Sequence, residues 1–586
     1  MNTTIKYRIF SLLSLLWVGC NDEFLERYPL DRISGDTYWN TENDLAVYNN
    51  SLYHMTLNNN DVPILHGHTA DDWSSIWNQD EMSDNMAILG IRHVFYQEIR
   101  SGKHNVPATP GWFGYKGWNF VRAVNVGLAN YNRADIPQEI IDRYAGEARL
   151  FRGWFYAEKV SKYGDVPWID RELNIDSEEL YAPRTPREEA MAHVLEDLNF
   201  AAEKLPNNWN DGNTPGRLNR WAALLVKSRV CLFEGTWRKY HGGSNADLWL
   251  AEAAKAAKEL IEDGPYRLYV TGDIHNDYNA YHRILDLSGN PEVLYWRKYK
   301  AGVLTNHIQV PFNEIASGTK SLVEDYLASD GLPITLSPLY EGDEEIEDVF
   351  KNRDPRLRQT ILHPEDKEKY RYHLGNALSY PRVIGMEANP SATGYHIVKF
   401  YNADDMIGKA YNTGESPAII LRFGEAMLNY AEALAELGTI TQHDLDISIN
   451  KLRDRVGMPH LTLNVPMDPR YAADGVSALI VEIRRERRVE LFAEGFRYND
   501  LRRWKQGKKL EQPTWGMRWN EAAIARYPDA EVRTAIDPVT GKTYIDVDQG
   551  SDWENPVFDE NKHYLWPIPL SELAQNPNIG QNPGWD

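Results

Sequence analysis

Apolar side chains recur every three or four positions over much of the chain, a spacing that places them on one face of an α-helix. The clearest case runs from residue 138 to 163 and ends at a Gly-Asp-Val-Pro sequence, which would stop a helix. A Thr-Pro cap begins another helix near Thr185 and that helix runs to Leu205. The same spacing predicts helices over residues 44–57, 117–131, 218–237, 246–261, 416–437, 443–455 and 476–504. The chain is therefore predicted to be mostly α-helical.

These predicted helices come in pairs, with alanines such as Ala148, Ala222 and Ala431 where two helices would touch. Small residues at such contacts are typical of tetratricopeptide-like repeats, which stack helix pairs into a superhelix. No strict consensus of about 34 residues is present, so the repeats would be strongly diverged.

Three stretches interrupt the helical pattern, at about residues 60–115, 265–415 and 505–560. Gly, Pro, Asn and Tyr are frequent in the long middle stretch, which also holds strand-like pieces such as residues 293–296. We expect these segments to form a loop-rich face with minor β-structure on a helical-repeat scaffold. Residues 44–586 would then form a single domain.

The N-terminus has the features of a secretory signal peptide. Lys6 and Arg8 precede about ten apolar residues that end at Gly19 and Cys20. The run is too short to cross a bilayer, which needs roughly 20 apolar residues. A cysteine in this place resembles the acylation site of bacterial lipoproteins, although Trp17 stands where leucine is usual.

We therefore expect residues 1–19 to be removed, Cys20 to carry lipid and residues 20–43 to form a tether. An ordinary signal peptide with a chance cysteine is the alternative. Cys231 is the only other cysteine, so a lipidated Cys20 leaves it without a disulfide partner. Its apolar helical surroundings predict that Cys231 is buried.

Charge and aromatic content narrow the choice of ligand. The formal net charge is -22, from 85 acidic and 63 basic side chains, and such a field repels nucleic acid. Aromatic residues make up 12% of the chain, including 19 Trp and 33 Tyr. Most of these rings are expected in the core, but flat rings also stack on the C–H faces of sugars.

A run of arginines at residues 484–488 would by itself suggest nucleic-acid binding. On a helix, Glu482 reaches Arg485 and Arg487 reaches Glu490 three residues along, so the charges are predicted to neutralise one another within the scaffold.

Motifs along nearly the whole chain resemble those of one family. They occupy residues 20–29, 37–42, 148–156, 162–167, 354–357, 428–433, 453–459, 483–491, 494–504, 565–569 and 576–585. In this order they resemble the SusD/RagB family, the surface nutrient-binding lipoproteins of outer-membrane glycan-uptake systems in Gram-negative bacteria.

The resemblance implies a mostly α-helical fold with about four tetratricopeptide-like helix pairs. It also implies a partner, a SusC-like TonB-dependent transporter on which the lipoprotein sits as a lid. Asp22 and Glu23, directly after Cys20, look like the family's surface-export signal, so a lipid-anchored protein exposed on the outer membrane is expected. The resemblance leaves the nutrient open.

Two regions are candidates for ligand contact. The first holds Trp73 and Trp77 among acids and an amide, namely Asp71, Asp72 and Asn78. Rings that stack and carboxylates that accept hydrogen bonds from hydroxyls suit a sugar. The resemblance adds the region near residues 290–320, where the candidates are Trp296, Tyr299 and His307. The alternative is that Trp73 or Trp77 anchors the loop on the scaffold.

No cofactor is expected. His66 and His68 lack the helical spacing of a zinc site and are expected in a surface loop. An acidic stretch offers oxygen ligands for Ca²⁺, but its spacing differs from an EF-hand loop; its members are Asp546, Asp548, Asp552 and Glu554.

Catalysis is not expected either, because no nucleophile, base and orienting group assemble in any known motif. Glycoside hydrolysis would need two carboxylates about 5–10 Å apart, and adjacent acids such as Asp404 and Asp405 are common in so acidic a chain. Capture of an oligosaccharide or polysaccharide is the leading hypothesis. Peptide binding of the RagB-like kind is the alternative, and a glycoside hydrolase the third. The sequence does not identify the glycan.

Overall fold

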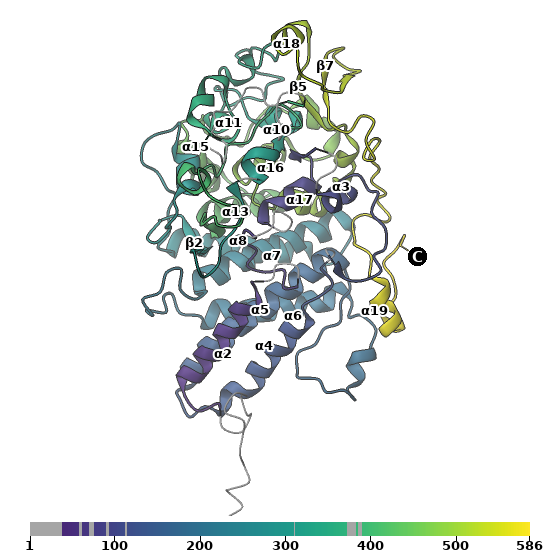
Figure 1. The fold of residues 1–586 in the computed structure, drawn as a ribbon. Helices are drawn as coiled ribbons and strands as arrows, with labels where there is room; N and C mark the ends of the chain where they lie inside the picture. The colour runs from purple at the N-terminus through teal and green to yellow at the C-terminus, as the bar shows by residue number, and fades with distance from the viewer. Residues whose placement is uncertain are drawn as a thin grey trace, which may run out of the picture.

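Helices stacked on one another make up the lower and middle parts of the molecule (Figure 1). The computed structural model describes residues 38–57, 61–69, 75–89, 93–111, 114–309, 311–371, 375, 383–384 and 390–585. Cys20, the signal peptide, most of the tether, and the candidates Asp71, Asp72 and Trp73 lie outside the described residues. Within the described part, no helix is both long and apolar enough to cross a membrane.

The stack begins with α2 (Glu42–Met55) and α4 (Trp118–Asn130), which pack against α5 (Gln138–Tyr163). Thr41 caps α2 and exchanges hydrogen bonds with Asp44, which satisfies amides that the first turn leaves without partners. The spacing of apolar residues gave the bounds of α5 correctly, because its Gly164 exit and Pro137 entry are explicit in the sequence.

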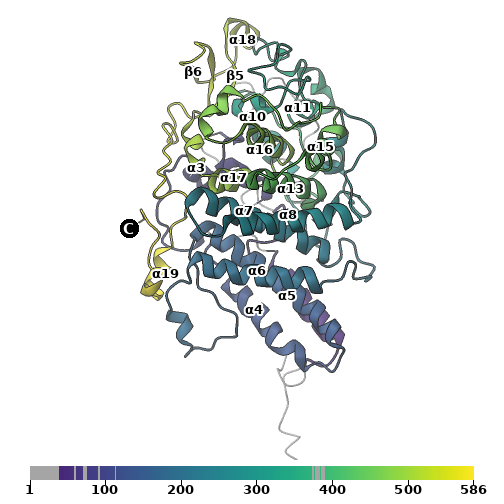
Figure 2. The same cartoon turned by 180° about the vertical axis from the view of Figure 1, so that it is seen from behind.

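Two further helix pairs continue the stack. Helix α5 packs on α6 (Arg187–Lys204), and α7 (Arg220–His241) packs on α8 (Ala246–Asp263). Helix α8 then contacts α13 (Phe423–Leu437), which packs on α16 (Ala478–Glu490). Figure 2 shows the same order of layers from behind. The prediction of a mostly α-helical repeat scaffold is confirmed.

The β-structure is small and antiparallel. Strand β2 (Val293–Arg297) pairs with β4 (Ala418–Arg422), and β1 (Met86–Ala87) pairs with β3 (Ser317–Gly318). A three-stranded sheet has the order β5 (Trp515–Arg518), β7 (Thr543–Asp546), β6 (Thr534–Ile536).

The remaining described helices are short. They are α3 (Val94–Arg100), α9 (Asp277–Ala280), α10 (Lys320–Asp325), α11 (Pro355–Thr360), α12 (Ala403–Met406), α14 (Gln442–Asp446), α15 (Ile449–Arg455), α17 (Arg497–Arg503), α18 (Glu521–Arg526) and α19 (Leu570–Gln575). Short 3₁₀ helices, such as η2 (Ile76–Met82) and η5 (Glu178–Tyr181), join several of them.

Three helix predictions were wrong in extent. The helix predicted over 443–455 is two short helices, α14 and α15, separated at residues 447–448. The helix predicted from residue 416 begins only at Phe423, because residues 418–422 pair with β2 instead. The helix predicted over 476–504 is two helices, since Ala493 and Gly495 both adopt positive φ between α16 and α17. A Cβ on Gly495 would lie 2.8 Å from the carbonyl oxygen of Ile76, so the close approach of these segments requires glycine.

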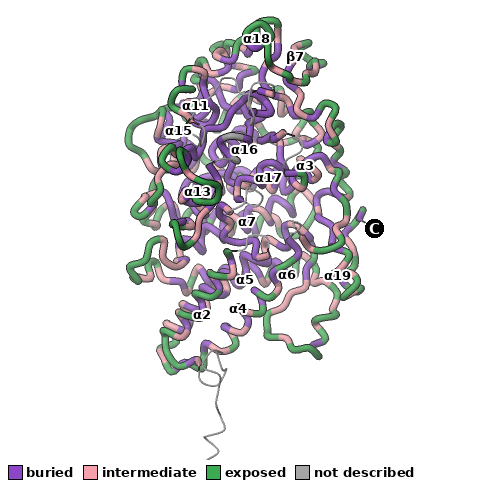
Figure 3. Tube along the Cα trace, in the orientation of Figure 1, coloured by how far each residue is buried: buried purple, intermediate pink, exposed green. Residues whose placement is uncertain are grey.

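Buried residues occupy the middle of the molecule, as the purple trace in Figure 3 shows. One large apolar cluster fills the helix stack and includes Cys231, whose predicted burial is confirmed. A second cluster lies around Phe312, Leu322 and Ile361. The candidate loop segment at residues 75–82 lies against this second cluster through Trp77.

The arginine-rich block on α16 is buried rather than solvated. Arg485 bonds Glu482 at 3.2 Å as predicted, but Arg487 pairs with Asp500 at 2.9 Å and not with Glu490. Glu490 instead accepts from arginines of other segments, namely Arg356, Arg422 and Arg455. The block therefore joins α16 to the rest of the molecule through paired charges.

Candidate ligand-binding site

The first candidate region is a loop closed at its base. The amide of Ile76 donates to the carbonyl of Gly67 at 3.0 Å, and the amide of Thr69 donates to the hydroxyl of Ser75 at 3.1 Å. These bonds hold the two ends of the loop together on either side of residues 70–74. The described residues on the two sides of the loop are therefore held next to one another.

Trp77 lies beneath this loop and has no exposed surface. Its ring packs against Phe312, with the ring centres 5.2 Å apart, and against His93. A ring without an exposed face has none to offer to a sugar, so we no longer assign a stacking role to Trp77. It anchors the loop, the alternative that the sequence left open.

Asn78 is fully buried too and supports the same turn. Its side-chain oxygen accepts from the amide of Ser75 at 2.8 Å, and its amide donates to Glu81 at 2.6 Å. Both hydrogen-bonding ends of Asn78 are therefore occupied within the protein. We reassign it from ligand contact to loop support.

Trp296 and Tyr299 are 3% and 4% exposed, although both were candidates for ligand contact. Trp296 is part of β2 and packs in a small cluster with Tyr281 and Val293. Tyr299 donates its hydroxyl to the carbonyl of His68, and burial raises the pKa of Tyr299 to about 12. Tyr299 thus fixes the loop from behind, and its burial leaves no ring face for a sugar.

His307 is placed differently, at the edge of the same loop. Its amide donates to the carbonyl of Thr69 at 3.0 Å, and its side chain is half-buried. Its ring lies 4.5 Å from that of Tyr411, which is 60% exposed, and its Nδ1 accepts from the amide of Asn412 at 3.3 Å. An open aromatic pair therefore lies beside Thr69, at the described end of the loop.

Sequence reasoning missed Tyr411. It is distant from His307 in sequence and belongs to the long irregular stretch, where periodicity gives no guidance. An isolated bridge between Asn306 and Gly414 brings the two segments together. The sequence nevertheless held a signal for this part of the site. An aromatic ring stands there beside turn-forming and amide residues, in the order Tyr411, Asn412, Thr413 and Gly414.

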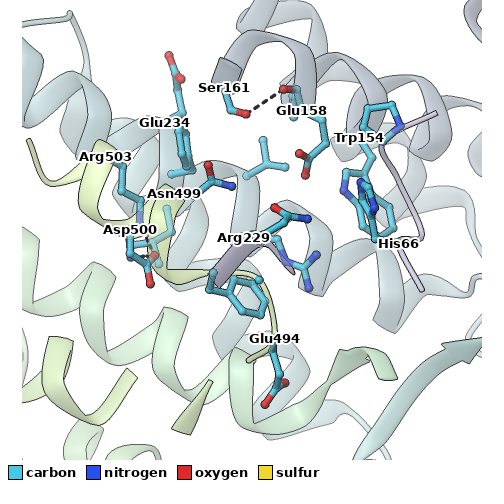
Figure 4. A pocket seen from close by; sticks show the side chains of 18 of the residues that line it. His66, Trp154, Glu158, Ser161, Arg229, Glu234, Glu494, Asn499, Asp500 and Arg503 are labelled. Atoms are coloured by element: carbon cyan, nitrogen blue, oxygen red, sulfur yellow. Dashed lines mark hydrogen bonds and ion pairs between the residues drawn. The ribbon is translucent and has the colours of Figure 1, made fainter. Parts of the chain in front are cut away.

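A cavity opens on the other side of the loop base, between the loop, α5, α7 and the segment before α17 (Figure 4). Its volume is about 950 Å³, part of which is open solvent. His66, Ile76 and Gln79 line it from the loop, and Glu158 and Asn499 from the helices. The loop thus has an aromatic edge on one side and a polar cavity on the other.

Most charged groups around this cavity are paired. Glu234 bonds Arg187 at 2.5 Å, and Asp500 bonds Arg503 at 2.9 Å. Glu158 points its carboxylate toward the open space (Figure 4). Burial raises the pKa of Glu158, while Lys162 and Arg229 act against that shift. Such a lining can accept hydrogen bonds from hydroxyl groups without adding a large net charge.

The two histidines of the loop lie in different surroundings. His68 is buried beside Tyr299, and His66 lines the cavity, so the expectation of surface histidines was wrong for His68. Burial lowers the pKa of each imidazole to about 3, which keeps both rings neutral. Across the described residues, no group of three or more His, Cys, Asp or Glu side chains is arranged to hold a metal ion.

The acidic stretch near the C-terminus has other partners. Asp548 forms an ion pair with Arg100 at 2.6 Å, and both side chains are about 5% exposed. Asp546 accepts from the amides of Asp548 and Gln549, and Glu554 from that of Gly550. These carboxylates shape their own turn and do not converge on one point.

Comparison with known proteins agrees with this fold. Residues 312–585 match the family model described as the SusD family, and residues 23–232 match a model described as "Starch-binding associating with outer membrane". Together the two segments take in most of the chain. The chain belongs to the SusD/RagB family.

Relatives of this family match over the full length. The SusD-like protein P2 of Formosa agariphila is 22% identical over 99% of this chain and 100% of its own. A SusD-like protein of Bacteroides ovatus is also 22% identical, over 99% of this chain and 97% of its own.

Solved SusD-like structures share the fold. One, described as a SusD-like carbohydrate binding protein of Bacteroides fragilis, superposes with a TM-score of 0.71 at 23% identity and covers 93% of this chain and 100% of its own. Another, described as a laminarin binding SusD-like protein, has a TM-score of 0.60 at 18% identity, with 93% and 100% covered.

Proposed function

We propose that this SusD-like protein captures an oligosaccharide or polysaccharide at the cell surface and delivers it to a SusC-like TonB-dependent transporter in the outer membrane. The observation that carries the proposal is family membership in both halves of the chain, with one family model described as starch-binding. Solved relatives of the same fold are described as carbohydrate-binding and laminarin-binding, which supports a glycan ligand.

The site that we propose is the edge of the loop over residues 67–76. Tyr411 and His307 offer ring surface for stacking on a sugar, and Trp73 in the loop would add a third ring. Asp71 and Asp72 would accept hydrogen bonds from vicinal hydroxyls. The role of the loop is supported by the buried residues below it, which hold both of its ends.

The cavity beneath the loop extends this proposal. Gln79 and Asn499 present amides, and Glu158 a carboxylate, to a space that is partly apolar through Trp154 and Phe496. Mixed apolar and hydrogen-bonding linings suit the end of a sugar chain. We propose that the loop edge holds the chain of the glycan and that the cavity receives a terminal unit.

The proposal contains no catalytic step. The cavity carboxylates Glu234 and Asp500 are engaged in ion pairs with arginine, and the same holds for Glu494, which bonds Arg422 at 2.6 Å. Burial opposes ionisation of Glu494, but Arg422 and Lys399 outweigh burial and lower its pKa. A glycosidase needs a general acid with a raised pKa and a second, suitably spaced carboxyl group. Glu158 has a raised pKa, but these other cavity carboxylates are held in ion pairs with arginine.

Lipidation of Cys20 would hold the protein at the outer membrane. Replacing the cysteine, Cys20→Ala, is expected to move the protein from the membrane fraction to the soluble fraction of cells. Fractionation and surface protease digestion measure this, with the native chain as control. Retention of Cys20→Ala in the outer membrane would contradict lipid anchoring.

Affinity electrophoresis tests the function itself. Folded protein is run through native gels that contain single polysaccharides, including starch, laminarin, xylan and mannan, beside a gel without polysaccharide. At least one polysaccharide is expected to retard migration. No retardation on a broad panel, together with binding to a peptide library, would contradict glycan capture and favour the peptide alternative.

A further inference from the structure

A second groove lies where the connection between α6 and α7 meets β2. Its lining comes from residues 207–219, 265–266 and 287–296. Its volume is about 750 Å³, against about 950 Å³ for the cavity under the loop, and both volumes include open solvent. Among the described residues, the groove and that cavity share no lining residue.

Three half-buried aromatic rings line this groove: Trp209, Tyr266 and Tyr295. Trp209 is held in place because its indole N–H donates to the carbonyl of Leu218 at 2.9 Å and its ring packs on Tyr144. The guanidinium of Arg217 lies 5.4 Å from the centre of the Trp209 ring. The Trp209 ring is therefore fixed by the scaffold, which favours preformed binding.

Amide side chains stand between these rings. Asn207, Asn213 and Asn290 all line the groove, and Asn207 and Asn213 are exposed. Asn290 uses its oxygen to accept from the amide of Glu292 at 3.0 Å, which leaves its NH₂ group as a donor. An amide offers two donors and an acceptor, the pattern that sugar hydroxyls require.

The groove carries little net charge. Asp211 and Arg217 are the charged residues in its lining, and Arg217 is already bonded to Glu147 at 2.6 Å. A phosphate or sulfate would find no free cation here, and a polyamine would find only one exposed carboxylate. Rings, amides and near-neutrality together fit an uncharged ligand rich in hydroxyls.

We propose that this groove is a second carbohydrate-binding site, which holds a short stretch of a neutral glycan on the scaffold apart from the loop. The inference rests on the proposed function for the class of ligand, but on different residues. Two sites on one protein raise the effective concentration of a long glycan at each of them. The second site would therefore favour polysaccharides over short oligosaccharides.

Hydrogen–deuterium exchange tests the groove directly. The full chain is incubated at millimolar concentration with neutral trisaccharides, namely maltotriose, laminaritriose, cellotriose, xylotriose and mannotriose. At least one is expected to slow amide exchange in residues 207–219 and 287–296. Protection should persist in the double variant His307→Ala, Tyr411→Ala, and its apparent Kd should rise at least about tenfold in Asn207→Ala, Asn213→Ala.

Asn561→Ala, an exposed asparagine elsewhere on the surface, is the matched control and should bind as the native chain does. No protection by any trisaccharide, or protection that vanishes in the His307, Tyr411 variant, overturns the second site. Gel retardation without groove protection would leave the proposed function standing. If a trisaccharide protects the groove but no polysaccharide retards the protein in gels, the loop site would be contradicted and the groove site would stand.

Discussion

At the scale of single residues, the molecule depends on carboxylates that are buried and still ionised. Glu432 is an example, since it accepts from Arg503 at 2.8 Å and from the indole N–H of Trp504 at 2.6 Å. Burial raises its pKa, but Arg503 and Arg487 outweigh burial and hold the pKa of Glu432 at about 2. Removing either partner would leave a buried charge without compensation.

This residue predicts how stability depends on pH. In the unfolded chain a glutamate has a pKa of about 4.3, so the contribution of Glu432 is present above that pH. It is lost as the pH falls from about 4.3 toward 2, because only the unfolded state takes up the proton in that range. The lost contribution is on the order of 3 kcal/mol.

Urea unfolding at pH 7, 4 and 3 measures this dependence. Glu432→Gln is expected to be less stable at pH 7 by about 3–5 kcal/mol and to lose less on acidification. Glu189→Gln, an exposed glutamate on α6, is the control and should follow the native chain. Parallel pH curves for the native chain and Glu432→Gln would contradict the assignment.

At the scale of elements, the loop over residues 67–76 depends on one close approach. A Cβ on Gly67 would lie 2.5 Å from the hydroxyl oxygen of Tyr299 and 2.8 Å from Cδ of Arg297. Real Cβ atoms do not approach so closely, so any larger residue must displace Tyr299 or the loop. The glycine thus allows the loop to be fixed from behind by a buried tyrosine.

Gly67→Ala is therefore expected to weaken glycan binding about tenfold and to destabilise the fold by about 1–3 kcal/mol. Tyr299→Phe alone loses one hydrogen bond, worth about 1 kcal/mol. The double variant Gly67→Ala, Tyr299→Phe should recover part of the binding, because the hydroxyl oxygen that obstructs the new Cβ is removed. Titration calorimetry on all four chains checks this; equal binding by Gly67→Ala and the native chain would contradict it.

Periodicity predicted the long helices well, because α5 to α8 carry an apolar face and Pro, Asn or Gly marks their ends in the sequence. It failed where contacts between residues distant in sequence determine the local structure. Residues 418–422 read as the start of a helix, yet they pair with β2 across more than a hundred residues. Arg487 and Glu490 have the right spacing for a pair, yet each finds a better partner elsewhere in the core.

The candidate site was harder to predict for the same reason. Composition showed that rings and acids cluster at residues 71–82, but not which ring is exposed. Trp77 and Asn78 became supports because the second core cluster lies directly beneath them. Tyr411 joined the site only through the bridge between Asn306 and Gly414. The exposure of a side chain depends on the whole fold, so a local sequence pattern does not predict it.

At the scale of the whole molecule, the helix stack is a rigid base that presents loops from distant parts of the chain together. The fold is shared with SusD-like proteins over nearly its full length, and on shared folds the function is set by the site rather than by the scaffold. The central claim is that glycan binds at the loop edge, where His307 and Tyr411 form an exposed aromatic pair.

Titration calorimetry with the polysaccharide that retards the native chain tests this claim most directly. Tyr411→Ala is compared with Tyr181→Ala, a tyrosine of the same 60% exposure on η5. The account predicts that Tyr411→Ala raises the Kd at least about tenfold while Tyr181→Ala binds as the native chain does. Unchanged affinity in folded His307→Ala, Tyr411→Ala would contradict it.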